Sequence, residues 1–172
     1  MATKISRRHL LTSAGAGVIA GAGALVAASP ALAAASPTYA QLLAKAVIEA
    51  RNKALVLDFW TNVFDAQDIS KAANYLAVDY IQHTPTVGQG LQGFIDAFSP
   101  FWPEPLPPAE IIPTRFVEVV ASGDLVQLVQ TFTLPDPDNP GTTYDAFWFD
   151  LYRVRGNLLV EHWDPATKPE AP

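Results

Sequence analysis

Apolar residues recur at three- and four-residue spacing after residue 36, and this pattern predicts one long amphipathic helix. Ser36 is the expected N-cap and Pro37 the first helical residue. Residues 65–68 break the pattern, and Asp68 is the expected cap of a short second helix over residues 69–76. The predicted buried stripe of the long helix comprises Leu42, Leu43, Ala46, Val47, Ala50, Ala54, Leu57, Trp60, Val63 and Phe64.

A short strand is predicted over residues 79–83, and a third helix follows it. The buried side of that helix consists of Leu91, Phe94, Ile95 and Phe98. Gly88, Gly90 and Gly93 are too scattered for a phosphate-binding loop, so they indicate turns and close packing. Residues 100–108 are rich in proline and predict a loop, because proline cannot continue the helix.

The remainder of the chain alternates as strands do, over residues 111–121, 125–134, 142–155 and 158–164. Short turns or loops rich in Gly, Asp, Asn and Pro separate these runs, which predicts an antiparallel meander. Helices first and a curved antiparallel sheet afterwards predict an α+β domain, a cone-shaped barrel in which the sheet encloses the N-terminal helices. Such an arrangement leaves an apolar pocket between sheet and helices.

Residues 1–34 have the features of a signal peptide, so the predicted divisions are this segment, a domain over 35–165 and a tail over 166–172. Basic residues precede an uncharged stretch, and Ala31-Leu32-Ala33 offers a cleavage site. The run from Ser6 through Arg7 and Arg8 to Leu11 resembles a twin-arginine (Tat) motif. We therefore expect export by the Tat translocase to the periplasm or the extracellular space. The alternative is a membrane anchor, because residues 10–34 are long enough to span a bilayer.

Composition narrows the functional classes. The chain has 172 residues, of which 49% are hydrophobic and 16% charged, and this fits one globular domain. Its net charge of −6 argues against a nucleic-acid partner, which needs a basic face. The absence of cysteine excludes disulfides, thiolate metal sites and a cysteine nucleophile.

The candidate chemistry lies on strands. On the last strand His162 and Asp164 share one face, while Glu161 and Trp163 share the other. Asp150 stands among aromatic residues, where a carboxyl either finds a partner or becomes neutral through desolvation. With His83, these residues offer a base and a group that stabilises an oxyanion. Removal of a proton beside a carbonyl needs only these two parts and no cofactor.

Less specific interpretations of these residues stay open. His83 is equally well a hydrogen-bonded rim residue, Asp164 before Pro165 can simply end its strand, and Trp60 can be plain core. His83, His162 and Asp164 would suit a two-His, one-carboxylate metal site, but their spacing carries no metal signature, and no metal is expected.

Three segments together resemble the SnoaL-like polyketide cyclase group of the nuclear transport factor 2-like superfamily. They are residues 75–85 (YLAVDYIQHTP), residues 90–95 (GLQGFI), and residues 150–154 (DLYRV) followed by 161–164 (EHWD). The resemblance covers roughly residues 55–165. It implies an α+β barrel with a hydrophobic pocket, often dimeric. It also implies ring closure by intramolecular aldol condensation without metal or cofactor.

The same resemblance assigns roles to single residues. The acid/base aspartate of a His-x-Asp pair corresponds to Asp164, with His162 as its partner. The oxyanion-hole aspartate of the related ketosteroid isomerases corresponds to Asp150. An aromatic residue on the first helix borders those pockets, near the position of Trp60. The isomerase base is absent, since His83 precedes Thr84-Pro85 there, so steroid isomerisation is not implied.

The leading hypothesis is an exported SnoaL-like protein that performs cofactor-free acid/base chemistry on a small apolar carbonyl compound, of aldol or isomerisation type. Its expected catalytic residues are Asp164, His162, Asp150 and His83. Trp60 and Trp148 are the expected pocket walls, while Tyr80 and Trp163 join them only if a bulge turns them inward. The alternatives are a non-catalytic binding module for a small lipophilic ligand and a dimeric interaction domain that uses the open sheet face.

Overall fold

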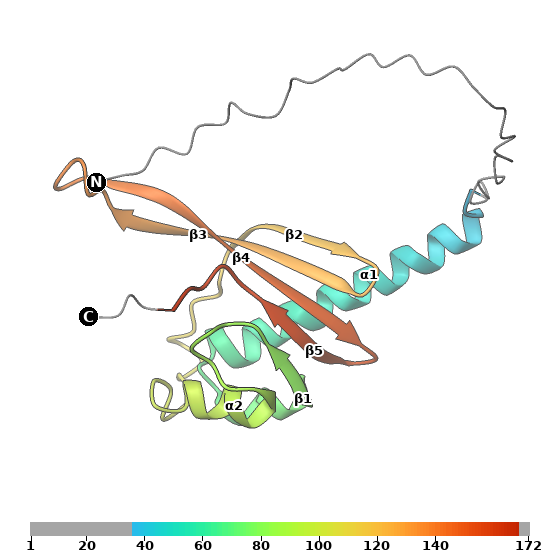
Figure 1. Cartoon of the computed structure of the whole chain (residues 1–172), viewed down its shortest axis with the longest axis horizontal. Helices are drawn as coiled ribbons and strands as arrows, with labels where there is room; N and C mark the ends of the chain where they lie inside the picture. The colour runs from blue at the N-terminus through green and yellow to red at the C-terminus, as the bar shows by residue number, and fades with distance from the viewer. Residues whose placement is uncertain (1–35, 169–172) are drawn as a thin grey trace, which may run out of the picture. The chain divides into compact units, whose positions relative to one another are not determined.

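Helices precede a five-stranded sheet in the computed structural model, which describes residues 36–168 (Figure 1). The helices are α1 (Tyr39–Phe59), a π-helical turn η1 (Trp60–Asp65), a 3₁₀ helix η2 (Ile69–Asn74) and α2 (Gly90–Phe98). The expected signal peptide and its anchoring alternative lie outside the described residues. Within residues 36–168, no helix is long and apolar enough to cross a membrane.

The sheet contains β1 (Leu76–Gln82), β2 (Phe116–Ser122), β3 (Leu125–Pro135), β4 (Thr143–Arg155) and β5 (Leu158–Trp163), in the order β1-β5-β4-β3-β2. Strands β2 to β5 form the predicted antiparallel meander. The α+β class is confirmed, with one correction, because β1 pairs with β5 in parallel. A parallel pair needs a long crossover, and here α2 and strands β2 to β4 lie between the two strands in the sequence.

Helix α1 begins at a capping box rather than at Ser36. The Thr38 hydroxyl accepts a hydrogen bond from the Gln41 backbone N–H, and the Gln41 side chain accepts one from the Thr38 N–H. The reciprocal pair satisfies two of the amide donors that a helix start leaves free. The prediction of a Ser36 cap is therefore wrong.

Only the C-terminal half of α1 is buried. Leu42, Leu43 and Val47 are exposed, whereas Val56 and Phe59 are completely buried. The β2–β3 turn explains the boundary, because its Gly123 backbone hydrogen-bonds the side chains of Glu49 and Asn52. The helix before that point extends beyond the sheet, so the expected buried stripe is wrong for that half.

The segments flanking the helices also differ from expectation. Asp68 makes no side-chain cap; its Oδ1 instead accepts the Ser70 hydroxyl, and η2 ends at Asn74 because β1 already begins at Leu76. Strand β2 starts at Phe116 rather than at residue 111. The preceding Thr114 gives its backbone N–H and its hydroxyl to Asp65 on η1, so this segment is tied to the helix instead of the sheet.

Aromatic packing fixes the helices against the sheet. The Phe59 ring contacts Phe64, Tyr75, Phe94 and Tyr152, with centroid separations of 5.4–6.0 Å. These partners come from η1, the start of β1, α2 and β4, so one buried ring connects four parts of the fold. The pairs with Phe64 and Tyr152 are edge-on, and aromatic pairs of this kind add to the free energy of burial. The packing holds the walls of the cavity described below in fixed positions.

The glycines around α2 are turn and packing residues, as predicted. A Cβ added at Gly93 would lie 2.2 Å from the Gly88 carbonyl carbon. The loop after β1 therefore crosses α2 at backbone contact distance. This contact places α2 over one end of the sheet.

Candidate active site

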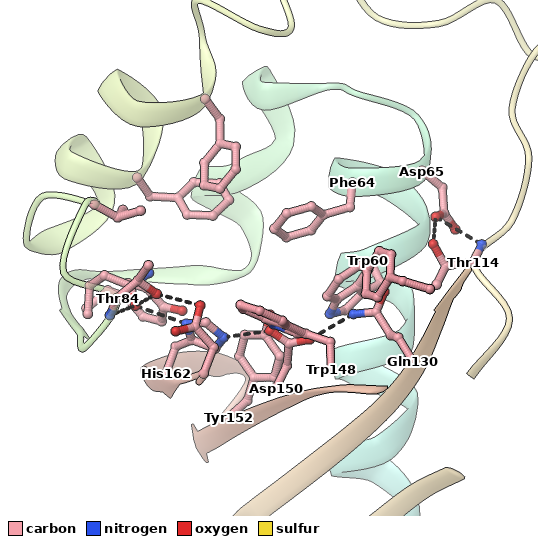
Figure 2. Close-up of a pocket in the computed structure, with 17 residues that line it drawn as sticks. Trp60, Phe64, Asp65, Thr84, Thr114, Gln130, Trp148, Asp150, Tyr152 and His162 are labelled. Carbon is pink, nitrogen blue, oxygen red and sulfur yellow. Dashed lines mark hydrogen bonds and ion pairs between the residues drawn. The ribbon is translucent and has the colours of Figure 1, made fainter. Parts of the chain in front are cut away.

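A cavity of about 370 Å³ lies between the sheet and the helices (Figure 2). Its apolar wall is aromatic and includes Trp60 and Phe64 of η1, Phe94 of α2 and Trp148 of β4. Trp60 and Phe64 stack at 4.4 Å, four residues apart in the π-helical turn. The structure thus places the two predicted wall residues, Trp60 and Trp148, in the cavity lining. Turns of this wide kind occur frequently at functional sites.

The polar wall comes from the sheet. Alternation along β4 and β5 directs Asp150, Tyr152 and His162 inward, and all three are buried. Asp164, which follows β5 directly, also lines the cavity. Three of the four predicted catalytic residues are therefore brought together here, and their catalytic roles remain predictions.

Hydrogen bonds join the polar residues into a chain along this wall, visible as dashed lines in Figure 2. His162 Nδ1 lies 2.9 Å from Gln82 Oε1, and His162 Nε2 lies 3.1 Å from Asp150 Oδ1. Gln130 Nε2 donates to Asp150 Oδ2 at 2.8 Å. All four side chains are nearly excluded from solvent, so each contact counts more than it would at the surface.

The partners of Gln82 fix the tautomer of His162. The Thr84 backbone N–H, which can only donate, lies 3.0 Å from Gln82 Oε1. That contact identifies the atom as the amide oxygen, an acceptor. His162 Nδ1 must then carry a proton and donate it to the same oxygen.

With Nδ1 protonated, one further proton lies between His162 Nε2 and Asp150 Oδ1. Without it, two acceptors would face each other at 3.1 Å in a buried site. The pair is therefore either imidazolium with carboxylate or imidazole with carboxylic acid. In both forms it holds one proton at the wall of the cavity.

Asp164, in contrast to the pair that holds a proton, accepts hydrogen bonds. Its Oδ1 accepts the Ala166 backbone N–H at 3.0 Å, and its Oδ2 lies 2.8 Å from the Thr84 hydroxyl. That hydroxyl is also 2.9 Å from Gln82 Oε1. The lone pairs of Gln82 Oε1 are already taken by Thr84 N–H and His162, so the Thr84 hydroxyl donates to Asp164. Asp164 therefore accepts two hydrogen bonds at the cavity wall, as an ionised carboxylate does.

His83 lies outside the cavity, so its predicted place in the pocket is wrong. Its side chain is 43% exposed, stacks on Trp163 at 5.1 Å, and contacts Glu161 at 2.9 Å on the outer face of the sheet. The pairing of β1 with β5 is irregular between Leu76 and Ile81. Strand alternation lapses there, and beyond it Tyr80 faces inward while His83 faces outward.

Tyr80 and Trp163 were expected to join the pocket only if a bulge turned them inward; Tyr80 lines the cavity and Trp163 does not. The regular inward orientation of His162 forces Trp163 to the other face. Trp163 instead packs against His83 and beneath the Arg153 guanidinium, 5.5 Å from its ring centroid. It is therefore a residue of the outer sheet surface.

Two tyrosine hydroxyls border the cavity. Burial, and next the nearby Asp150 carboxyl, raises the pKa of both Tyr80 and Tyr152 well above the usual value. Both phenols consequently stay protonated at every pH at which the protein would work. Tyr152 also stacks on the His162 ring at 4.6 Å.

The metal set considered from sequence is not assembled, since His83 is on the outside. Asp150, His162 and Asp164 do have oxygen or nitrogen atoms within 4.8 Å of one another. For a cation to bind His162 Nε2, the contact of that atom with Asp150 would have to open. The arrangement of hydrogen bonds suits protons better than a cation.

Sequence reasoning missed Gln82, Thr84, Gln130 and Tyr152. Tyr152 could have been predicted from the sequence, because it lies two residues from Asp150 on the same strand and must share its face. Gln82 and Thr84 depended on the irregularity in β1, and Gln130 on the pairing of β3 with β4. Such long-range pairing leaves no signal in the local pattern.

The sheet curves around a buried helix end and encloses a cavity with a His-x-Asp pair at the end of its last strand, as the resemblance to SnoaL-like proteins implies. The family of the SnoaL-like domain matches residues 56–162, more than half of the chain, and the protein belongs to that family.

Solved structures similar to the chain include three of low sequence identity. TsrD from Streptomyces laurentii is 20% identical over 67% of this chain and 87% of its own, with a TM-score of 0.47. A candidate polyketide cyclase from Acidithiobacillus ferrooxidans is 20% identical over 68% and 88%, with a TM-score of 0.48. An LEH-like epoxide hydrolase from M. tuberculosis is 12% identical over 67% and 82%, with a TM-score of 0.48. No curated protein matches the chain significantly.

Proposed function

We propose that this protein catalyses cofactor-free acid/base chemistry, an aldol condensation or an isomerisation, on a small neutral carbonyl compound. The observation that carries the proposal is the pairing of an accepting carboxylate, Asp164, with a proton held between His162 and Asp150 in one cavity. Groups whose surroundings give them opposite proton affinities are the usual basis for assigning base and acid.

The steps follow from these positions. Asp164 takes a proton from the carbon beside the carbonyl, so that a C–H bond breaks and an enolate forms. The pair of His162 and Asp150 holds a proton at the same wall, where its dipole can stabilise the developing oxyanion. In an aldol step the enolate carbon then bonds to a second carbonyl carbon, whose oxygen takes up a proton. In an isomerisation the proton returns to a different carbon.

The charge of the cavity restricts the substrate. Its described lining contains Asp65, Asp150 and Asp164, and neither lysine nor arginine. A carboxylate or phosphate group on the substrate would therefore be repelled without a compensating cation. The volume of about 370 Å³ is near the lower end for ligand sites, which favours a compact apolar molecule.

Exchange of hydrogen for deuterium tests the chemistry without knowledge of the natural substrate. Neutral bicyclic ketones such as 1-tetralone are incubated with the protein in D₂O, and deuterium uptake beside the carbonyl is followed by NMR. Wild type should accelerate the uptake, and Asp164→Asn should lower it about 10²- to 10⁴-fold, the usual contribution of a general base. If the ketones bind wild type but take up deuterium no faster than they do with Asp164→Asn, the protein is a non-catalytic binding module.

Export through the Tat pathway is part of the proposal and is supported by Arg7 and Arg8 within the twin-arginine motif. An Arg7→Lys/Arg8→Lys variant should keep the precursor in the cytoplasm. Unchanged export in cell fractionation would contradict this route.

A further inference from the structure

Tyr80 and Tyr152 line the cavity, and neither hydroxyl donates a hydrogen bond to another residue within 36–168. Tyr80 on β1 and Tyr152 on β4 are each 2% exposed. Tyr75 provides the contrast, since its hydroxyl donates to Asp58 Oδ2 at 2.7 Å. Both hydroxyls border the cavity, so each is available to donate a hydrogen bond to an acceptor on a ligand.

The hydroxyls lie where an oxygen acceptor is useful. Both phenols line the same cavity as Asp164, and both are close enough to Asp150 and Asp164 for these carboxyls to act on their pKa. Because that pKa is raised, each phenol keeps its proton and acts as a donor. A ketone oxygen between them would stand beside the base that attacks the neighbouring carbon.

Trp60 orients one of the two donors. Its Nε1–H is completely enclosed and makes no hydrogen bond of good geometry within the described residues, but it lies near Tyr152 Oη and lowers the pKa of that phenol. An indole N–H can only donate, so it does not compete for the phenol proton. The single Tyr152 proton is then free to point into the cavity.

We propose that the hydroxyls of Tyr80 and Tyr152 together bind the carbonyl oxygen of the substrate and stabilise it as the enolate forms. This inference rests on the proposed function and deepens it, because it assigns the oxyanion contacts to two phenols in addition to the Asp150–His162 pair. It also defines the substrate, whose reacting carbonyl must be unhindered enough for two donors to reach one oxygen.

A matched pair of ligands tests the assignment. 1-Tetralone and tetralin share the same bicycle, but only the ketone has an oxygen. Binding is followed through the fluorescence of the tryptophans in the cavity wall. Each of Tyr80→Phe and Tyr152→Phe should weaken the binding of 1-tetralone about three- to tenfold, the effect of one hydrogen bond. The affinity for tetralin should not change. Tetralin thereby reports whether the cavity is intact.

Catalysis gives a second readout. At saturating 1-tetralone each variant should lower deuterium exchange more than it lowers affinity, by about tenfold or more, because the donors act most strongly on the enolate. Tyr75→Phe is the control, since the Tyr75 hydroxyl donates to Asp58. This variant should alter neither the ratio of the affinities for 1-tetralone and tetralin nor the exchange rate.

The outcomes separate this inference from the proposed function. If both variants bind and exchange 1-tetralone as wild type does while Asp164→Asn does not exchange it, the phenols are not the oxygen site and only this inference is overturned. If Asp164→Asn also exchanges at the wild-type rate, the proposed function is overturned. If neither ligand binds wild type, both are overturned.

Discussion

At the scale of single residues, His162 has two different neighbours for its two ring nitrogens. Gln82 Oε1 can only accept, and it therefore holds a proton on Nδ1. Asp150 can either accept or donate, and it therefore shares the second proton with Nε2. In the proposed reaction the amide of Gln82 would act through His162, because it determines which nitrogen faces the acid group.

The tautomer can be measured directly. Nitrogen-15 NMR of the imidazole should show a protonated Nδ1 for His162 throughout the neutral pH range, because Gln82 Oε1 offers only lone pairs. His83 on the outer face provides an internal reference in the same spectrum. An unprotonated Nδ1 with a protonated Nε2 at neutral pH would contradict the assignment.

Strand alternation alone predicted how the residues of the last two strands are arranged, but it failed on β1. On β5 the pattern is regular, so the inward placement of His162 and the outward placement of Glu161 follow from spacing two. On β1 the alternation lapses between residues 76 and 80 and is regular from Tyr80 onward, so Tyr80 faces inward and His83 outward. A bulge is set by pairing with another strand, and the local sequence does not reveal it.

At the scale of elements, the long first helix shows what periodicity can and cannot predict. The apolar spacing predicted its existence and its contact with the sheet. It did not show where the sheet ends, and so it overestimated the buried length on the N-terminal side. It also did not show that the helix widens after Phe59 into η1, which brings Trp60 and Phe64 to the cavity.

The crossing of α2 over the preceding loop predicts an unusual response to a helix-favouring mutation. Replacement of a helical glycine by alanine ordinarily stabilises a protein. At Gly93 the new Cβ would lie 2.2 Å from the Gly88 carbonyl carbon. Gly93→Ala should therefore destabilise the fold by about 1–3 kcal/mol in urea unfolding, as overpacking does.

The adjacent exposed position supplies the control for that mutation. Gln92→Ala should change the free energy of unfolding by about 0.5 kcal/mol or less, as surface substitutions do. An increase in stability for Gly93→Ala would contradict the close backbone contact.

Glu161 contacts His83 and Arg153 on the outer face of the sheet. These contacts predict that the stability of the fold depends on pH. The hydrogen bond of Glu161 with His83, and then its pairing with Arg153, lowers its pKa below the ordinary 4.5. A lowered pKa in the folded state adds stability that is present above pH 4.5 and is lost as pH falls through the folded value. Glu161→Gln should thus cost about 0.5–1 kcal/mol at neutral pH and less in acid.

Urea unfolding at neutral and acidic pH measures this difference. Glu118 on β2 is exposed, and Glu118→Gln should show little dependence on pH by comparison. A cost for Glu161→Gln that grows towards low pH would contradict the predicted sign.

At the scale of the whole molecule, the fold class and the family followed from the order of elements and from three short segments. The shape of the cavity could not be predicted in this way, because it depends on side chains that meet from β1, β3, β4, β5, η1 and α2. The possible homodimer remains a prediction, as does export, whose signal lies outside the described residues. The apolar Phe147 and Phe149 are exposed on the outer sheet face that such a dimer would cover.

The central claim is that the cavity combines a base and a held proton around a neutral carbonyl. Two carboxylates in its lining allow a matched comparison, because Asp164 has an oxygen within 4.8 Å of ligand atoms of Asp150 and His162, whereas Asp65 is bound to Thr114 and is not in that group. The two variants Asp164→Asn and Asp65→Asn carry the same chemical change at different walls. Any general effect of removing a charge should appear in both.

The most direct measurement is the rate of deuterium exchange into saturating 1-tetralone by these two variants and wild type. We expect Asp164→Asn to lose about 10²- to 10⁴-fold while it still binds the ketone, and Asp65→Asn to keep most of the rate. Equal rates in all three proteins, with the ketone bound in each, would contradict the account.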